Sequence, residues 1–279
     1  VGIGFGALER NTTGTLNTAV GDGALYLNTT ASCNTAVGVS ALAANTTSDN
    51  NTAFGFKALF TQVADGARNT AIGLCALHGN TSGDDNVAVG YGAGDSNTTG
   101  SSNISVGSGA LDANSTGSHN VAIGNLALND NTTANSNVAI GTESLDVNTT
   151  GADNTAVGTN ALGANTTALG NVAVGSGALA ANTTGTKSVA MGMNALKSAT
   201  VGGTNTAIGF EALCNVTDNQ DNTAIGRCSN TVTTTGYGIT TVGSNSNPAG
   251  ATDTNEIVIG GQTGKGTSTA FINAYNTAV

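Results

Sequence analysis

Apolar and polar residues in this chain follow a pattern that repeats every 17 residues. From Asn154 to Gly170 the sequence is NTAVGTNALGANTTALG, and Asn171 begins the same pattern again. We number the glycine that follows the apolar residue as position zero. Sixteen such glycines occur, always 17 residues apart except for one step of 18 between Gly55 and Gly73. A strict internal period of this length is the signature of a repeat architecture.

Each repeat predicts one short strand. Position −1 is apolar in all sixteen repeats, and position −3 is Thr, Val or Ile in all of them. Alternating β-branched residues are typical of a strand, here four or five residues before each glycine, such as 154–157. Because strand side chains alternate in direction, positions −3 and −1 share one face. We predict that −3, −1 and the Leu at +4 point inward, and that the Ala residues at −2 and +3 point outward.

The sequence therefore predicts an all-β fold, a parallel β-solenoid or β-roll of about sixteen 17-residue coils. Adjacent coils are expected to stack about 4.8 Å apart, and each coil is stable only through its neighbours. The glycines at zero and the leucines at +4 should then form ladders along the coils, including Gly21, Gly38, Gly124, Gly158, Gly175, Leu25, Leu42 and Leu162.

The chain divides into regular and divergent repeats. Residues 1–243 keep the 17-residue pattern, whereas in 244–279 the Leu and Asn signatures fade and the single proline, Pro248, appears. We expect 244–279 to lead into a downstream module that this sequence does not contain. Since the chain begins and ends inside a repeat, we also expect it to be a segment of a longer protein.

Asparagine recurs at two further positions. It occupies −4 in twelve repeats and +7 in ten. Stacked Asn side chains can hydrogen-bond in a ladder parallel to the backbone bonds, so we predict such a ladder at +7, including Asn28, Asn45, Asn148 and Asn165. Thirteen N-x-S/T sequons occur, ten of them at +7. Dense glycosylation is the alternative interpretation, but an inward Asn is inaccessible to a transferase.

Composition narrows the possible partners. Charged residues make up 9% of the chain and the net charge is −10, without the clustered Lys and Arg that nucleic-acid binding requires. No apolar run reaches the roughly 18 residues of a membrane helix, so no membrane insertion is expected. The four cysteines match neither a zinc pattern nor a disulfide between adjacent coils, and they are predicted to be free thiols.

Candidate chemistry is sparse. The run Gly264 to Ser268 lacks the Lys-Ser/Thr step of a phosphate loop, and His78 and His119 lie on variable turns of distant coils. The acidic residues do not form the regular ladder of a calcium β-roll. Glu143, Glu211 and Glu256 are isolated rather than paired across a groove. We therefore predict no enzymatic activity, no cofactor and no metal site.

The motif N-T-A-V-G-x-x-A-L resembles the Asn/Ser-x-Ala-Ile-Gly-x-x-Ala repeats of trimeric autotransporter adhesin heads. The form with N-T-T-G between strands is similar to the repeat shafts of phage and large-virus tail fibres. The resemblance covers residues 1–243. It implies a parallel β-roll with three chains side by side, and in such fibres a segment like 255–260 often precedes a C-terminal chaperone module.

These observations predict a structural role. We expect the shaft of an extracellular, cell-surface or virion-attached fibre that spaces and presents an adhesive tip. A receptor or glycan would bind through a module outside this segment. The alternatives are a repeat surface that itself binds glycan or ice, and the non-catalytic stalk of a tail-spike depolymerase.

The expected partner is the chain itself, as a parallel homotrimer. Outward Ala rows would let two sheets pack closely, because a short side chain leaves no void between them. The interchain rows are predicted to include Ala139, Ala156, Ala161 and Ala178. The alternative is a monomer whose Ala rows line its own narrow core.

Overall fold

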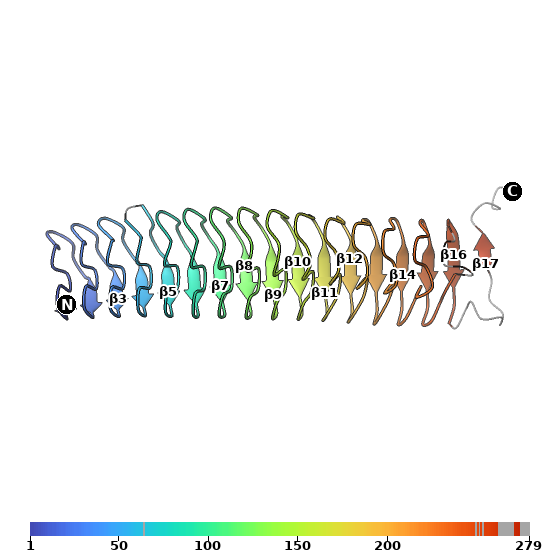
Figure 1. Ribbon diagram of the computed structural model, residues 1–279, viewed down its shortest axis with the longest axis horizontal. Helices are drawn as coiled ribbons and strands as arrows, with labels where there is room; N and C mark the ends of the chain where they lie inside the picture. The colour runs from blue at the N-terminus through green and yellow to red at the C-terminus, as the bar shows by residue number, and fades with distance from the viewer. Residues whose placement is uncertain (64, 249, 251, 253, 262–270, 274–279) are drawn as a thin grey trace. The chain divides into compact units, whose positions relative to one another are not determined.

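The protein is an all-β parallel β-solenoid of about 15 turns with coils of about 17 residues. The computed structural model describes residues 1–63, 65–248, 250, 252, 254–261 and 271–273. Contacts divide the chain into two compact units, Val1–Thr142 and Glu143–Val279. Within each unit the strands follow one another in chain order, one per coil (Figure 1). The predicted fold class is confirmed.

The first unit contains nine strands, each pairing in parallel with the next along the chain. Their bounds are β1 Gly2–Ile3, β2 Thr18–Val20, β3 Thr35–Val37, β4 Thr52–Phe54, β5 Thr70–Ile72, β6 Val87–Val89, β7 Ile104–Val106, β8 Val121–Ile123 and β9 Val138–Ile140.

The described part of the second unit contains eight strands. β10 to β16 pair in parallel, and β17 pairs antiparallel with β16. Their bounds are β10 Thr155–Val157, β11 Val172–Val174, β12 Val189–Met191, β13 Thr206–Ile208, β14 Thr223–Ile225, β15 Thr240–Val242, β16 Glu256–Ile259 and β17 Phe271–Asn273. The predicted divergent region, 244–279, includes 262–270 and 274–279, which lie outside the described residues, and the module that it is expected to lead into lies beyond this sequence. It stays a prediction.

The coils stack in register, with equivalent residues side by side. Thr18 pairs with Thr35, and Val172 pairs with Val189, each one period apart. The glycine at position zero has φ near +135°, a region that L side chains avoid. A Cβ on Gly124 would lie 2.5 Å from the carbonyl oxygen of Gly141 in the next coil. Only glycine therefore fits this position.

The core contains the Ala rows, which corrects the predicted strand orientation. Ala at −2, Ala at +3 and Leu at +4 are buried within the chain, whereas the side chains at −3 and −1 point outward. The predicted inward position of Leu162 is confirmed, since its exposure is 0%. The predicted interchain positions of Ala139, Ala156, Ala161 and Ala178 are wrong, because each is completely buried inside its own coil.

In the regular coils the space between the strand and the opposite turn is filled by small side chains, with Ala at both −2 and +3. In the first coil, where glycine replaces Ala at −2, a Cβ on Gly2 would lie 3.8 Å from the Cβ of Ala7 at +3. That is ordinary van der Waals contact, so an alanine at each position already fills the gap. A larger residue at −2 would overpack a regular coil, whereas the divergent coils, which have Asn instead of Leu at +4, hold Thr241 and Val258 there. The larger β-branched residues therefore occupy the outward positions of the regular coils.

The coil closes through residues in the left-handed region. Positive φ recurs at +2, +4 and +12 of most coils, for example at Glu143 and Leu145 (φ 55° and 51°) and at Asp153 (φ 58°). A non-glycine residue in this region costs on the order of 1–2 kcal/mol. Burial of the Leu at +4 offsets that cost, since a fully buried Leu contributes about 1.5–3 kcal/mol.

The single 18-residue coil is accommodated by a longer side chain. In regular coils the Asn at +7 donates to the carbonyl oxygen three residues later, as Asn80 does to Gly83 at 3.0 Å. In the longer coil this position is Gln62, which is completely buried and donates to the carbonyl oxygen of Gly66, four residues later. The extra methylene of Gln thus spans the extra backbone residue.

Candidate functional site

The asparagines at +7 form a hydrogen-bonded ladder inside the solenoid. Asn165 Nδ2 donates to Asn148 Oδ1 at 2.8 Å and to the carbonyl oxygen of Ala168 at 3.2 Å. The same arrangement joins Asn28 to Asn11 at 2.7 Å, and Asn45 to Asn28 at 3.2 Å. The predicted ladder residues Asn28, Asn45, Asn148 and Asn165 have 0% exposure. The nitrogen that would carry a sugar is therefore in the core, engaged in hydrogen bonds.

A second Asn ladder lies at −4 and fixes the orientation of the strand. Asn34 Oδ1 accepts from the backbone N–H of Asn51 at 2.8 Å, and Asn34 Nδ2 donates to the carbonyl oxygen of Ser48 at 2.9 Å. Both amide ends thus bond to the next coil. Since −4 points inward, −2 must point inward too, and −3 and −1 must point outward. The shared direction of positions −4 and −2 was the sequence signal for which face is buried, and the β-branched residues at −3 and −1 obscured it.

The outward strand face is consequently apolar and uncharged. We call this surface the strand face, and define it as the side chains at −3 and −1. In the first unit its exposed large residues are Val1, Ile3, Phe54, Ile72, Val87, Ile104, Ile123 and Ile140. In the second unit they are Met191, Ile208, Ile225 and Ile259. The remaining positions are Val, Ile or Thr, so a row of β-branched side chains faces outward in each unit.

Exposed large apolar side chains recur on neighbouring strands of this surface. Single exposed apolar residues are normal, but contiguous apolar patches larger than a few hundred Å² mark interaction sites. Phe54 is 56% exposed and Ile72, in the next strand, is 40% exposed. The strand face therefore has the chemistry of an interaction surface.

The threonines at +8 have their hydroxyls committed to neighbouring coils. Thr29 Oγ1 donates to the carbonyl oxygen of Thr46 at 3.1 Å, and Thr81 Oγ1 donates to that of Thr98 at 2.9 Å. The same bond recurs at Thr166 and Thr183 in the second unit. These hydroxyls reinforce the stacking of coils.

Ionisable groups form only small local clusters. Arg68 Nε lies 2.6 Å from Asp85 Oδ1, and this hydrogen bond raises the pKa of the guanidinium and lowers that of the carboxyl. His78 Nδ1 lies 3.5 Å from Asp95 Oδ1. Burial, and then the charges of Asp95 and Asp130, raise the pKa of Asp112. These pairs are scattered over surface turns and bring no nucleophile next to a base.

The cysteines are free thiols, as predicted. Burial raises the pKa of the Cys214 thiol, and burial followed by the charge of Asp95 raises that of Cys75. Within the part of the chain that the structure describes, no group of three or more His, Cys, Asp or Glu side chains is arranged to hold a metal ion. His78 and His119 lie in coils that are not adjacent.

The described residues include no helix long and apolar enough to cross a membrane.

Comparison of the chain with protein-family models, with curated proteins and with solved structures gives no match.

Proposed function

We propose that this protein is a structural shaft of an extracellular or virion-attached fibre, which spaces and presents an adhesive tip. The observation that carries the proposal is the contrast between the interior and the outward strand face of each coil. The interior is occupied by intrachain ladders of Gly, Ala, Leu and Asn, and the strand face presents an uncharged β-branched surface coil after coil. Such a chain is suited to repetition and lateral packing rather than to a single reaction centre.

The shaft is proposed to be a parallel homotrimer that buries the strand face of each chain. The Ala rows are inside the chain, so they cannot be the contact between chains. The rows at −3 and −1 provide the alternative, since Val, Ile and Thr on neighbouring strands make a flat surface that packs well. Chains related by a rotation axis along the coils would present the same face to one another at every level.

An ice-binding surface has less support than a shaft. Ice recognition would need regular outward hydroxyls, whereas the Thr hydroxyls at +8 donate to carbonyl oxygens of the next coil. The outward Thr residues at −3 follow one another over four coils in the first unit, from Thr18 to Thr70, and over three in the second, from Thr206 to Thr240. Val and Ile occupy −3 in most of the other described strands, so a row of outward Thr hydroxyls extends over only part of each unit.

The test places charge on the strand face without touching the core. Ile123→Glu with Ile140→Glu substitutes two residues that are 38% and 37% exposed, so a monomer should tolerate them. The matched control is Thr116→Glu with Thr133→Glu, at exposed turn positions of the same two coils. In native mass spectrometry and sedimentation, we expect wild type and control to be trimers and the strand-face variant to be a folded monomer.

Two results would overturn the assembly. One is a folded wild-type monomer at micromolar concentration. The other is a trimer that survives the two strand-face glutamates. Circular dichroism of both variants separates dissociation from unfolding, because the parallel strands of a dissociated chain keep their signal.

A further inference from the structure

A row of aromatic side chains runs along the outer surface of the first unit at position +5. Tyr26, Phe60 and His78 occupy this position in their coils, and Ala43 occupies it in the coil between Tyr26 and Phe60. The rings of Phe60 and His78 are stacked, with centroids 5.4 Å apart and planes 5° from parallel. One coil step thus accommodates one ring, and Ala43 interrupts the stack.

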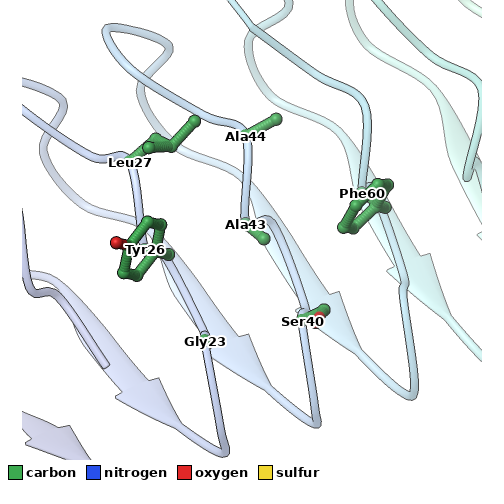
Figure 2. Close-up of a pocket in the computed structure, with 7 residues that line it drawn as sticks. All are labelled: Gly23, Tyr26, Leu27, Ser40, Ala43, Ala44 and Phe60. Carbon is green, nitrogen blue, oxygen red and sulfur yellow. The ribbon is translucent and has the colours of Figure 1, made fainter. Parts of the chain in front are cut away.

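The interruption creates a notch on the surface. Its volume is about 280 Å³. Figure 2 shows Ala43 on the coil between those that carry Tyr26 and Phe60, with its short side chain leaving the space between the rings open. The notch is lined by Gly23, Tyr26, Leu27, Ser40, Ala43, Ala44 and Phe60. The lining is thus mainly apolar, with hydroxyls only on Ser40 and Tyr26.

The spacing of the walls matches one flat ring. Tyr26 and Phe60 are two coils apart, roughly 9.6 Å at about 4.8 Å per coil. A ring at the level of Ala43 would lie one coil step from each wall, the same step that separates Phe60 from His78. Offset stacking at such centroid distances is favourable for aromatic rings. A sugar ring would find few hydrogen-bond partners here, because its several hydroxyls would face apolar side chains.

A cation lies close to each of the two rings, although Arg10 belongs to the coil before Tyr26 and is therefore on the side of that ring away from Ala43. The guanidinium carbon of Arg10 lies 5.5 Å from the centroid of Tyr26, and Lys57 Nζ lies 5.3 Å from that of Phe60. Among the described residues, the ion pairs involve Arg68 and His78, and neither Arg10 nor Lys57 contacts a carboxylate. In a chain of net charge −10, an unpaired cation in the same coil as Phe60 favours an anionic group on the ligand.

We propose that the notch binds a single aromatic ring that carries an acidic group, such as an aryl carboxylate. The ring stacks between Tyr26 and Phe60 at the level of Ala43, and its carboxylate lies toward Lys57. The site is distinct from the strand face, and it does not depend on the proposed trimer. The ligand can be a free aromatic acid or the same group attached to a polymer.

The first experiment measures binding of benzoate to the whole chain by ligand-observed NMR, with two matched ligands. Cyclohexanecarboxylate has the charge without the flat ring, and benzylammonium has the flat ring with the opposite charge. A small site of this kind gives a Kd on the order of 1 mM. We expect benzoate to bind at least about fivefold more tightly than either comparison ligand. Its affinity should fall between about 20 mM and about 500 mM NaCl.

The decisive variant fills the notch with the residue type found elsewhere in the row. Ala43→Phe should complete the stack from Tyr26 to His78 and weaken benzoate binding at least tenfold. Ala180→Phe is the matched control, since Ala180 is also a half-buried residue at +5. It should leave binding unchanged. Tyr26→Ala and Phe60→Ala should each weaken binding about 2- to 10-fold, and they test the site even if Ala43→Phe folds poorly.

Three results would overturn the proposal. The first is equally tight binding of benzoate to Ala43→Phe and to wild type, and the second is binding of cyclohexanecarboxylate as tight as that of benzoate. The third is the absence of benzoate binding up to about 50 mM, well above the expected Kd. Attachment to a polymer is then examined with benzoylated and unmodified dextran. If the immobilised protein retains benzoylated dextran and not unmodified dextran, the ligand can be attached to a polymer. If it retains neither form, the site takes free aromatic acids only.

Discussion

A regular coil of the first unit and a divergent coil of the second have opposite polarity at four of five equivalent buried positions. In the coil that begins at Gly107, positions +3, +4, +7, −4 and −2 are Ala110, Leu111, Asn114, Asn120 and Ala122. In the coil that begins at Gly226, they are Ser229, Asn230, Thr233, Ile239 and Thr241. All ten are buried. Polar side chains have replaced the Ala and Leu core, and Ile has replaced an Asn.

The difference teaches that the coil needs a filled interior more than a fixed pattern of polarity. Ser229 Oγ and Thr241 Oγ1 lie 2.8 Å apart across the position where two Ala residues normally touch. However, the buried polar groups of the divergent coil are less completely hydrogen-bonded than those of the regular ladders. Asn230 Nδ2 and Thr233 Oγ1 are buried without a hydrogen-bond partner. Because a buried orphan polar group costs about 1–3 kcal/mol, the divergent coil should be the weaker of the two.

The largest expected effect comes from placing charge in the regular interior. Ala156→Glu with Ala161→Glu puts two carboxylates where neither water nor a partner is available. We expect the free energy of unfolding to fall by more than about 5 kcal/mol, so that the surrounding coils unfold. Circular dichroism during thermal unfolding measures it. A folded variant that merely changes its oligomeric state would restore the Ala rows to an interchain surface and contradict the structure.

The next effect isolates the amide ladder. Asn165→Ala removes the donor to Asn148 Oδ1 and to the carbonyl oxygen of Ala168, and the acceptor for Asn182. The expected loss in free energy of unfolding is about 2–4 kcal/mol, measured by urea denaturation. The control is Val216→Ala, in a coil that has Val instead of Asn at +7, and it should lower the free energy of unfolding by less. Equal losses would mean that the ladder acts only by filling space.

A smaller change should stabilise the protein where the ladder ends. Asn182 Oδ1 is buried without a partner, because the next +7 residue is Ala199. Ala199→Asn would supply the missing donor and raise the free energy of unfolding by about 1 kcal/mol. Ala199→Leu has similar bulk without an amide and should destabilise through overpacking. If both variants behave alike in urea denaturation, hydrogen bonding at this point contributes nothing.

The smallest effect concerns a row in which identical charges are stacked. The raised pKa of Asp112 means that the folded state holds this proton more tightly than the unfolded state. Folding stability from this group is therefore greatest at low pH and is lost as pH rises through the folded pKa. Asp112→Asn should raise the free energy of unfolding at pH 7 slightly, by roughly a few tenths of a kcal/mol, as measured by urea denaturation. The advantage should vanish near pH 4, and a pH-independent difference would contradict it.

Much of the architecture was predictable from the period. The stacked glycines, the Leu row and the buried Asn residues at +7 were each marked by one residue type at one spacing, since only that type satisfies the local backbone or the amide ladder. The facing of the strand was not predictable from hydrophobicity. Val157 is larger and more apolar than Ala156, so in a wider core burial of Val157 would have been favoured. The width of the interior decided the matter, and it depends on the opposite turn.

The candidate surfaces were missed for related reasons. The strand face was assigned to the core by the same error, although the Asn at −4 carried the parity that corrects it. The notch at Ala43 requires the orientation of rings on successive coils. The spacing of Tyr26, Phe60 and His78 could have suggested an aromatic row, but the sequence alone does not show whether the row stacks.

The in-register pairing of coils has a consequence for how the gene can change. Each coil presents to the next the same sequence of donors and acceptors that it receives from the previous one, as Thr18 does to Thr35 and Thr35 to Thr52. Loss or duplication of one whole period within a unit leaves every remaining pairing intact. A change by any other number of residues displaces all the side chains that follow, unless one turn absorbs it, as Gln62 does. Recombination between repeats can therefore lengthen or shorten the protein, but only in steps of one coil.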